Sequence, residues 1–520
     1  MKIFHYLVWA FAIIPSTFLA QANHDYNMVL GYQSNSNTPE TELYNFNFNN
    51  PSDNPFDLFD GFFDIWFSAT TMSDDQGNLI FYTNGCQIAN TNHELMENGD
   101  SLNVGPYYFE RDCNAYHNNS TLSAYNAGTQ SIMSLPVPFS DNEYYLIHLL
   151  KELTPDPINL GTAWIPKMLL TRLDMNANDG LGTVLYKNEP ILEDTLSYGL
   201  ITAVKHADNN RWWILCSQFH SNKYYSLLLG NDGVESIIEQ SIGPLIPEGN
   251  ESAGMRVFSP DGNKIALNNF ETELVLYDFD RETGTLSNAV EIHLNDLDQY
   301  IGGVCFSSNN RYLYAASTDT LYQLDMEAPD IAASKTIVAI YDGYTDPFTL
   351  NFYQMERGPD CKIYINSTAG AQNLHVIMSP DSPGLACDVR QHYLQLPSPR
   401  NRNLLNAPNY RLGTPYPTCD STINVVSSST EPIAPPPITD GGVRVFPNPA
   451  RERATVVFDL PFHGTLTLHD AHGRELLRQT AGGLTEYDLN LGTLPGGVYF
   501  VRATTREGFV RTVRLVRMWE

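Results

Sequence analysis

The sequence predicts an all-β protein: a β-propeller followed by a small C-terminal β-sandwich. Three observations support this fold. The 520-residue chain is rich in Tyr, Phe, Thr, Val and Asn, and its Gly and Pro are spread evenly, a composition that favours strands joined by tight turns. A unit of strand, polar turn and strand recurs through most of the chain. A Ser/Thr/Pro-rich stretch then separates this region from a short segment of alternating apolar and polar residues.

The first 22 residues have the pattern of a secretory signal peptide. Lys2 precedes an apolar run from Ile3 to Ile14, and Ala20-Gln21-Ala22 fits a small-x-small cleavage site at Ala20 and Ala22. We therefore expect the mature chain to start at Asn23. The apolar run is too short for a stable membrane span and no later stretch is long enough, so we expect no transmembrane segment in the mature chain. The alternative is a buried N-terminal helix.

The formal net charge of −29 falls on the larger, N-terminal region. Residues 442–520 carry ten Arg and no Lys against eight Asp or Glu, so the excess of acidic residues lies outside them. A body this acidic repels nucleic acid and anionic membrane surfaces. The charge therefore argues against nucleic acid as a partner.

Six polar turns of similar chemistry mark the repeated unit. They begin at these residues: Ser73, Ser140, Ala207, Ser259, Ser307 and Gly358. In the turn Ser259-Pro260-Asp261-Gly262, Pro presets φ, Asp can bond its own backbone, and Gly accepts the left-handed conformation. The turn starts lie 48 to 67 residues apart, and about four strands fit each interval. This spacing is typical of propeller blades, as in WD40-like repeats.

Six turns predict six blades, with seven as the alternative. The last unit lacks an outer strand after the run LHVIMS, which ends at Ser379. We expect two N-terminal strands, YNMVLGY and ELYNFNF, to supply that outer strand and close the ring. The predicted propeller covers residues 23–420.

Several runs in this region resemble uncharacterised secreted propeller proteins of the Bacteroidota. The runs are GNLIFYTNGCQIAN, ENGDSLN, GPDCKIYINS, NLHVIMSPDSPGLAC and NAPNYRLG. The resemblance covers most of the predicted propeller. It implies a fold and an export route, and it implies no activity.

The seven cysteines of the chain show no C-x-x-C pair and no cluster with His at zinc spacing. Disulfides are the default interpretation in an exported protein. We expect Cys86 to pair with Cys113 across a polar loop, and Cys387 to pair with Cys419 across a Pro-rich segment. Two cysteines in apolar strand patterns are expected to be buried thiols: Cys216 and Cys305.

Residues 421–441 are rich in Ser, Thr and Pro and predict a semi-extended linker without a core. The runs VRVFPNP, ATVVFDL, GTLTLHDAHG, YDLNLG, GVYFVRATT and VRTVRLVR follow it. They alternate apolar and polar residues and predict the strands of one small β-sandwich at residues 442–520. Because the linker separates two regions of opposite net charge, we expect the regions to fold independently.

This C-terminal segment resembles the C-terminal sorting domain of the type IX secretion system. The matching residues are Phe446, Pro447, Asn448 and Pro449, the hairpin from Asp470 to Gly473, and the run from Leu494 to Tyr499 with Gly497 and Tyr499. The family often ends in a Lys-containing basic strand, whereas this chain carries Arg511, Arg514 and Arg517. The resemblance implies the type IX secretion machinery as partner. It also implies a secreted or outer-membrane surface-attached protein that travels via the periplasm, usually with removal of the tail.

No motif in the sequence indicates a known catalytic chemistry. The chain has no G-x-S-x-G, no H-E-x-x-H and no phosphate loop. Asp174 to Gly180 resembles a calcium loop, but its Gly comes one position late and the required Glu is missing. Ser73 to Gly77 resembles the sialidase Asp box in one degenerate copy. We interpret both segments as turns and expect no cofactor and no metal.

Two functional classes remain. The first is a non-catalytic surface protein that binds a glycan, a protein or a small molecule on one propeller face. The second is a secreted hydrolase or lyase that acts on glycans with channel carboxylates, for which Asp74/Asp75 and Asp278/Asp280 are candidate pairs. The first class is favoured because no catalytic constellation emerges. His93-Glu94 and His117 fall in a long insertion, which is either a binding loop or a solvated one.

Overall fold

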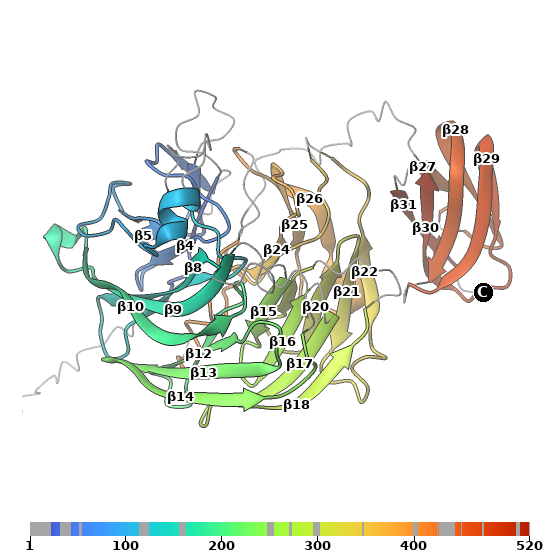
Figure 1. Ribbon diagram of the computed structural model, residues 1–520. Coiled ribbons are helices and arrows are strands. Elements are labelled where there is room, and N and C mark those ends of the chain that lie inside the picture. Colours follow the sequence, from blue (N-terminus) through green and yellow to red (C-terminus); the bar gives the residue numbers. More distant parts are fainter. Residues whose placement is uncertain are drawn as a thin grey trace, which may run out of the picture.

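Seven small antiparallel sheets stand around a common centre in the described part of residues 22–425, so this region is a seven-bladed β-propeller (Figure 1). The first strands of neighbouring sheets contact one another, which places them at the centre of the ring. Phe46 of the first sheet packs edge-on against Tyr364 of the seventh, with ring centroids 5.3 Å apart. The first and seventh sheets also share one buried apolar cluster, which closes the ring.

The computed structural model describes most of the chain. The described residues are 22–31, 43–50, 55–113, 124–154, 163–246, 254–269, 273–294, 302–345, 348–398, 404–415, 417–423, 425, 443–448, 450–470, 473–505 and 510–518. The predicted signal peptide up to residue 21, His117, Pro449 and most of the predicted linker lie outside them. No helix within the described ranges is long and apolar enough to cross a membrane.

The blades follow the chain order. Blade 1 contains β1 (Asn27–Leu30), β2 (Leu43–Asn47) and β3 (Phe56–Phe59), and blade 2 contains β4 (Thr70–Ser73), β5 (Leu79–Thr83) and β6 (Ile88–Asn90). Blade 3 contains β7 (Ile132–Pro136), β8 (Glu143–Leu153), β9 (Ala163–Asp174) and β10 (Thr183–Leu196). Blade 4 contains β11 (Thr202–Lys205), β12 (Trp212–Ser217), β13 (Lys223–Gly230) and β14 (Gly233–Ser241).

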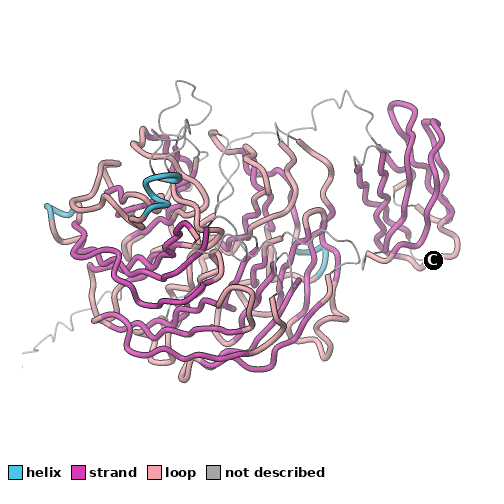
Figure 2. Tube along the Cα trace, viewed as in Figure 1, coloured by secondary structure: helices cyan, strands magenta, loops and turns pink. Residues whose placement is uncertain are grey.

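The remaining three blades each have four strands. Blade 5 contains β15 (Gly254–Phe258), β16 (Lys264–Asn269), β17 (Glu273–Asp280) and β18 (Thr285–Ile292), and blade 6 contains β19 (Val304–Phe306), β20 (Tyr312–Ser317), β21 (Thr320–Asp325) and β22 (Thr336–Ile340). Blade 7 contains β23 (Met355–Arg357), β24 (Ile363–Ile365), β25 (Asn373–Ile377) and β26 (Val389–Gln395). Short helical turns are few among the described residues (Figure 2); they are η2 (Tyr108–Asp112), η3 (Asn178–Gly180) and η4 (Gly384–Cys387).

The six predicted turns are all confirmed, and each joins the first two strands of one of blades 2 to 7. In the turn that starts at Ser259, the N–H of Gly262 donates to the Ser259 carbonyl at 2.8 Å, and the Ser259 hydroxyl donates to Asp261 at 2.6 Å. Gly262 has a φ of +75°, a left-handed conformation that glycine adopts without strain. Asn310 and Cys361 occupy the same place in their turns with φ of +64° and +67°.

The predicted role of the N-terminal strands is wrong. The two runs YNMVLGY and ELYNFNF contain β1 and β2, which pair with each other and with β3 to form a blade of their own. The seventh blade instead has its own outer strand, β26, which pairs with β25. β26 reads VRQHYLQ and is mostly half-buried, so its sequence lacks the apolar run that marks the other strands. The seven-blade alternative is therefore the observed one.

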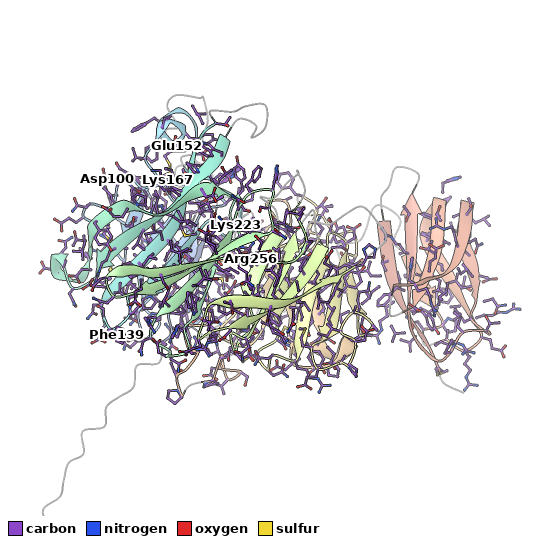
Figure 3. The ribbon with its side chains drawn as sticks, turned by 60° about the horizontal axis from the view of Figure 1, so that its bottom comes forward. Asp100, Phe139, Glu152, Lys167, Lys223 and Arg256 are labelled. Atoms are coloured by element: carbon purple, nitrogen blue, oxygen red, sulfur yellow. A yellow bond between two sulfur atoms is a disulfide. The ribbon has the colours of Figure 1, made fainter. Side chains whose placement is uncertain are left out.

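A buried arginine lies between blades 4 and 5. Arg256 on β15 is fully buried near the middle of the ring, whereas Phe139, on the turn between β7 and β8, is 74% exposed (Figure 3). The guanidinium of Arg256 donates to the Leu200 carbonyl and to the Ser217 hydroxyl, both at 2.9 Å. Its Cζ lies 5.2 Å from the centroid of the Tyr224 ring. These contacts give the buried cation polar and aromatic partners in place of a carboxylate.

The C-terminal segment is one five-stranded antiparallel sheet. Its strands are β27 (Val443–Phe446), β28 (Arg453–Asp470), β29 (Glu475–Asn490), β30 (Gly497–Thr505) and β31 (Val510–Arg517). The register of β28 against β29 shifts between Val457 and Phe462, where the sheet bends. The two halves face each other across one apolar core that includes Val456, Leu468 and Val501. The predicted sandwich is thus built from a single folded sheet.

One predicted disulfide is observed and the other is wrong. Cys86 and Cys113 are bonded, with Cα atoms 5.7 Å apart. Cys419 pairs with Cys361, not with Cys387, because the N–H of Asp420 donates to the Pro359 carbonyl at 2.6 Å and brings Cys419 beside the turn of blade 7. Three cysteines are buried thiols: Cys216, Cys305 and Cys387. Burial raises the pKa of the Cys387 thiol to about 11.

Candidate functional site: a polar pocket between blades 1 and 2

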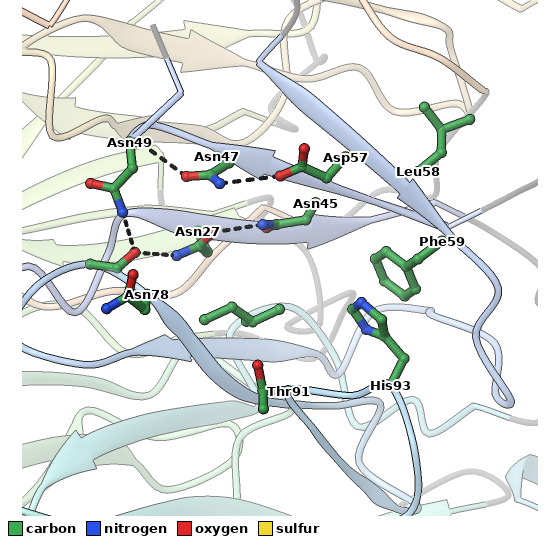
Figure 4. Close-up of a pocket in the computed structure, with 12 residues that line it drawn as sticks. Asn27, Asn45, Asn47, Asn49, Asp57, Leu58, Phe59, Asn78, Thr91 and His93 are labelled. Atoms are coloured by element: carbon green, nitrogen blue, oxygen red, sulfur yellow. Dashed lines mark hydrogen bonds between the residues drawn. The ribbon is translucent and has the colours of Figure 1, made fainter. Parts of the chain in front are cut away.

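A pocket of about 330 Å³ opens between blade 1 and blade 2. Its wall comes from all three strands of blade 1, from the turn between β4 and β5, and from the turn after β6 (Figure 4). The residues that line it are Asn27, Asn45, Asn47, Asn49, Asp57, Leu58, Phe59, Gly77, Asn78, Leu79, Thr91 and His93. Five asparagines line the pocket, which is unusual for the space between two blades because apolar side chains normally fill it.

The polar wall follows from the alternation of strand β2, which reads LYNFN. Tyr44 and Phe46 point to one face and join the apolar cluster shared with blade 7. Asn45 and Asn47 point to the other face, toward blade 2, because side chains alternate along a strand. The register sets Asn27 opposite Asn47 and Asn45 opposite Asp57, so the neighbouring strands extend the polar stripe.

Hydrogen bonds order this stripe (Figure 4). Asn45 Nδ2 donates to Asn27 Oδ1 at 2.6 Å, and Asn27 Nδ2 donates to the Gly77 carbonyl at 2.7 Å, which ties blade 1 to blade 2. Asn47 Nδ2 donates to Asp57 Oδ2 at 3.1 Å. Fixed partners hold the amide groups in one orientation, so the wall presents a preformed set of donors and acceptors.

One acceptor in this wall has no hydrogen-bond partner among the residues that the structure describes. Asn45 is 5% exposed, and its Oδ1 is buried without a hydrogen-bond partner among the described residues. A buried unpaired acceptor costs free energy, of the order of 1–3 kcal/mol. Because this oxygen has almost no exposed surface, a water or ligand could donate to it only if neighbouring side chains moved.

Aromatic rings form the opposite wall. Phe59 on β3 and His93, in the turn after β6, stack with centroids 3.7 Å apart and planes at 6°. The imidazole of His93 also contacts the Tyr82 hydroxyl, with Nδ1 3.2 Å from the oxygen. Burial lowers the pKa of His93, so the ring is neutral at neutral pH. The sequence places His93 in a long insertion that is either a binding loop or a solvated one, and the structure places it in the pocket wall.

The pocket combines the groups that recognise a neutral polar ligand. Amide groups and the exposed Asp57 carboxylate offer donors and acceptors, and the Phe59–His93 pair adds a flat apolar surface. A sugar ring has both kinds of surface, with hydroxyl groups at its rim and C–H groups on its faces. Within the described ranges, no group of three or more His, Cys, Asp or Glu is placed to hold a metal ion.

The centre of the propeller is filled by its own chain. Asn406 donates to the Ile201 carbonyl at 3.0 Å, and the Tyr410 hydroxyl donates to the Ser134 carbonyl at 2.9 Å. Asn409 Nδ2 donates to the Pro260 carbonyl at 2.7 Å. These partners belong to or adjoin the inner strands of blades 3, 4 and 5. The NAPNYRLG run therefore crosses the central channel as a plug.

The plug lines a central cavity of about 40 Å³, which is too small for a sugar ring. Glu356 on β23 lines this cavity, and burial holds the pKa of its carboxyl well above the usual value. Asp25 is engaged by Arg411 in a two-contact ion pair at 2.5 and 2.9 Å. Among the described residues, the cavity beside the plug is too small to hold a glycosidic bond between two carboxylates.

The carboxylate pairs that the sequence singled out have structural roles. Asp74 accepts from the N–H groups of Gln76 and Asn78 in the turn of blade 2, and Asp75 pairs with His24 at 3.1 Å. Hydrogen bonding to His24 lowers the pKa of Asp75. Asp278 pairs with a lysine, Lys264 Nζ, at 2.6 Å.

Asp280, the other member of the second carboxylate pair, and the calcium-like segment also lie at turns. Asp280 accepts from the N–H of Glu282 at 2.9 Å. The segment from Asp174 to Gly180 ends in the turn η3, and Asp174 accepts from the N–H of Asn176 at 2.8 Å. Solvation and turn geometry account for these carboxylates.

The predicted sorting residues other than Pro449, which is outside the described residues, lie in the C-terminal domain. Asn448 donates to the Arg514 carbonyl at 2.6 Å and accepts from the N–H of Val516 at 2.9 Å, which attaches the start of the domain to β31. The buried Tyr499 donates from its hydroxyl to the Pro495 carbonyl at 2.6 Å. Phe446 is 52% exposed at the end of β27.

The backbone at Gly497 does not require a glycine. Gly497 is the first residue of β30, and its φ is not positive. No atom lies within 4 Å of the position where a Cβ would stand. We therefore expect Gly497→Val to leave the C-terminal domain folded, with a change in thermal midpoint of less than about 3 °C. A midpoint lowered by more than that in the purified protein would contradict this view of the site.

Comparison with known proteins identifies the C-terminal domain. Residues 444–516 match the family described as the secretion system C-terminal sorting domain, which confirms the resemblance to the sorting domain of type IX secretion. No curated protein matches the chain.

Solved structures with related folds are distant. A candidate 6-phosphogluconolactonase from Bacteroides fragilis has a TM-score of 0.42 and 10% identity, over 72% of this chain and 96% of its own. A protein from Lactobacillus plantarum has a TM-score of 0.36 and 12% identity, over 72% and 98%. The propeller domain of Cps50 (Swd1) from Myceliophteria thermophila has a TM-score of 0.32 and 10% identity, over 65% and 93%. At these values the likenesses carry no argument about activity.

Proposed function

We propose that the protein is a non-catalytic binding protein of the cell surface or the secreted fraction, and that the pocket between blades 1 and 2 binds a glycan. The sorting domain at residues 444–516 supports export by the type IX secretion machinery. The predicted signal peptide supports passage through the periplasm, with residues 421–441 as linker between the propeller and the tail.

The polar stripe beside a stacked aromatic pair carries this proposal. Blade contacts are normally closed by apolar packing, and here buried asparagines stand in a hollow with an acceptor, Asn45 Oδ1, that lacks a partner among the described residues. The amide groups that face this hollow and the Asp57 carboxylate would hydrogen-bond the hydroxyl groups of a ligand. A sugar ring matches both the amide wall and the Phe59–His93 surface.

A hydrolase with channel carboxylates is the alternative, and it has less support. The cavity that the plug lines at the centre is about 40 Å³, and the carboxyl of Glu356 stands there without a hydrogen-bonded carboxylate partner among the described residues. Incubating each glycan that binds with the mature protein and measuring new reducing ends tests this alternative. Release of fragments at a rate that falls in Glu356→Gln would favour the enzyme.

Asp57→Ala should weaken binding of the glycan at least about tenfold, because the pocket then lacks its exposed charged acceptor. The ligand is first found by applying the purified mature protein to a glycan array, and affinities are then measured by calorimetry. Asp60→Ala is the matched control, since Asp60 is exposed on the same segment and does not line the pocket. Equal loss in both variants, or no loss in Asp57→Ala, would place the ligand elsewhere.

A further inference from the structure

Strand β30 of the sorting domain is apolar on both faces. Tyr499, Val501 and Ala503 point into the core of the domain. Val498 and Phe500 alternate with them and therefore point outward, where a lone small domain would expose them to water. Phe500 is nonetheless only 6% exposed, so another part of the chain covers it.

Blade 6 covers this outward face. Phe500 belongs to one apolar cluster with Ile337 and Ile340 of β22 and Tyr322 of β21, and Val498 packs against the same cluster. Figure 1 shows the C-terminal sheet standing beside β22. The nearby hairpin is also in contact, because a Cβ built on Gly473 would come within 2.5 Å of the Cδ1 atom of Ile337.

An ion pair continues the contact. Arg502, the next outward residue of β30, places Nη2 3.7 Å from Oδ2 of Asp319 in the turn between β20 and β21. The two side chains are 22% and 29% exposed. Burial raises the pKa of Asp319, and Arg502 opposes that shift. The contact therefore includes an apolar centre and a charged pair at its margin, as in many interfaces.

We propose that the outward face of β30, with Val498, Phe500 and Arg502, is a docking surface for blade 6 of the same chain. The sorting domain is thus held on the propeller by a non-covalent contact in addition to the linker. The expectation of two independent bodies, drawn from the linker and the charge, misses this contact. Opening the linker by proteolysis then leaves the sorting domain bound, and a change in the docking surface releases it.

The test starts from the full mature chain with a protease recognition sequence inserted between residues 427 and 440. After cleavage, sedimentation at several concentrations measures the mass of the species that carries the propeller. The expected result is one complex of a single propeller with a single sorting domain. Separation of the two parts at all concentrations, or a complex that contains two propellers, would overturn the proposal.

Phe500→Asp should weaken the association after cleavage at least tenfold, since a carboxylate would replace the buried ring. Leu484→Asp is the matched control: Leu484 is 63% exposed on β29 of the same domain, and its change should leave the association intact. Far-ultraviolet circular dichroism of each released sorting domain checks that the variant is folded. Retention of the Phe500→Asp domain at wild-type strength would overturn the proposal.

A charge exchange gives an answer even where Phe500→Asp fails to fold. Asp319→Arg faces Arg502 with a like charge and should weaken the association several-fold at low salt. Asp319→Arg combined with Arg502→Asp restores the opposite charges and should recover most of the loss. Two changes with purely additive effects would mean that the two side chains do not meet, and would overturn the proposed orientation.

Discussion

Arg411→Leu should lower the free energy of unfolding of the propeller by about 3–5 kcal/mol. Arg411 donates to both carboxylate oxygens of Asp25, and the two side chains are 6% and 13% exposed. It also donates to the Thr418 carbonyl at 3.1 Å and lies over the ring of Tyr26. Removing the cation leaves a buried carboxylate unpaired, and that desolvated charge is the physical reason for the large effect.

The measurement is guanidinium unfolding of the mature chain followed by tryptophan fluorescence. Arg390→Leu is the matched control, because its pair with Asp388 is at the surface, with side chains 43% and 47% exposed, and an exposed pair contributes at most about 1 kcal/mol. The double variant Asp25→Leu, Arg411→Leu should recover part of the loss, since it removes both charges. A loss in Arg411→Leu no larger than in the control would show that water screens the pair.

The position of the Asp25–Arg411 ion pair explains why it contributes strongly to the stability of the propeller. Asp25 precedes β1, and Arg411 belongs to the plug that crosses the centre, so residues 386 positions apart in the sequence meet there. The disulfide between Cys361 and Cys419 holds the same end of the chain to blade 7. The strands of blade 1 pair only with one another, so no blade is built from both ends of the chain. The ring is closed instead by side-chain packing between blades 1 and 7 and by contacts near the chain ends.

The sequence could predict the propeller because its turns are local. The residues from Ser259 to Gly262 form their turn through contacts among four neighbours, and the same chemistry recurs in blades 2 to 7. After Ser379 the sequence has no apolar run that marks the outer strand of the seventh blade, so the N-terminal strands are predicted to supply it. The number of blades depends on ring closure, a long-range property that no single turn encodes.

The disulfide partners show the same limit. Cys86 and Cys113 enclose one loop, and nearness in sequence predicts their pairing correctly. Cys419 lies 32 residues from Cys387 and 58 from Cys361, yet it pairs with the more distant one. The path of the plug decides this, because it returns the chain to the turn of blade 7. Cys387 instead ends the turn η4 and is packed in the apolar cluster of blades 6 and 7.

The pocket could be predicted only in part. The alternation of LYNFN shows that one face of β2 carries asparagines. If both faces of the strand are buried, the asparagine face must pack on a neighbouring blade through polar groups. Phe59 and His93 lie 34 residues apart, and only the packing of blade 1 on blade 2 brings their rings together. The sequence therefore shows that polar groups are present, but only the packing of the blades places them around a pocket.

Deletion of residues 443–520 should abolish delivery to the cell surface and leave the propeller in the periplasm. The deleted segment contains the whole match to the sorting domain, residues 444–516. The core of that segment is separate from the propeller cores, apart from the docking contact of β30, so the remaining chain keeps its own stabilising contacts. Export across the outer membrane should fail because the type IX secretion machinery has no sorting domain to bind. The predicted signal peptide still directs the chain through the inner membrane.

The measurement is cell fractionation with protease treatment of intact cells, in a host that has type IX secretion. Asn448→Ala gives a subtler variant, because it removes the two hydrogen bonds that attach the start of the domain to β31 while leaving the apolar core in place. We expect Asn448→Ala to lower the amount of protein at the cell surface by about the same fraction as it lowers the amount of folded sorting domain. Leu484→Asp is the control, since it changes an exposed position of the same sheet. Surface delivery of the protein without residues 443–520 would mean that the tail is an ordinary adhesion module, and that another part of the chain is read for export.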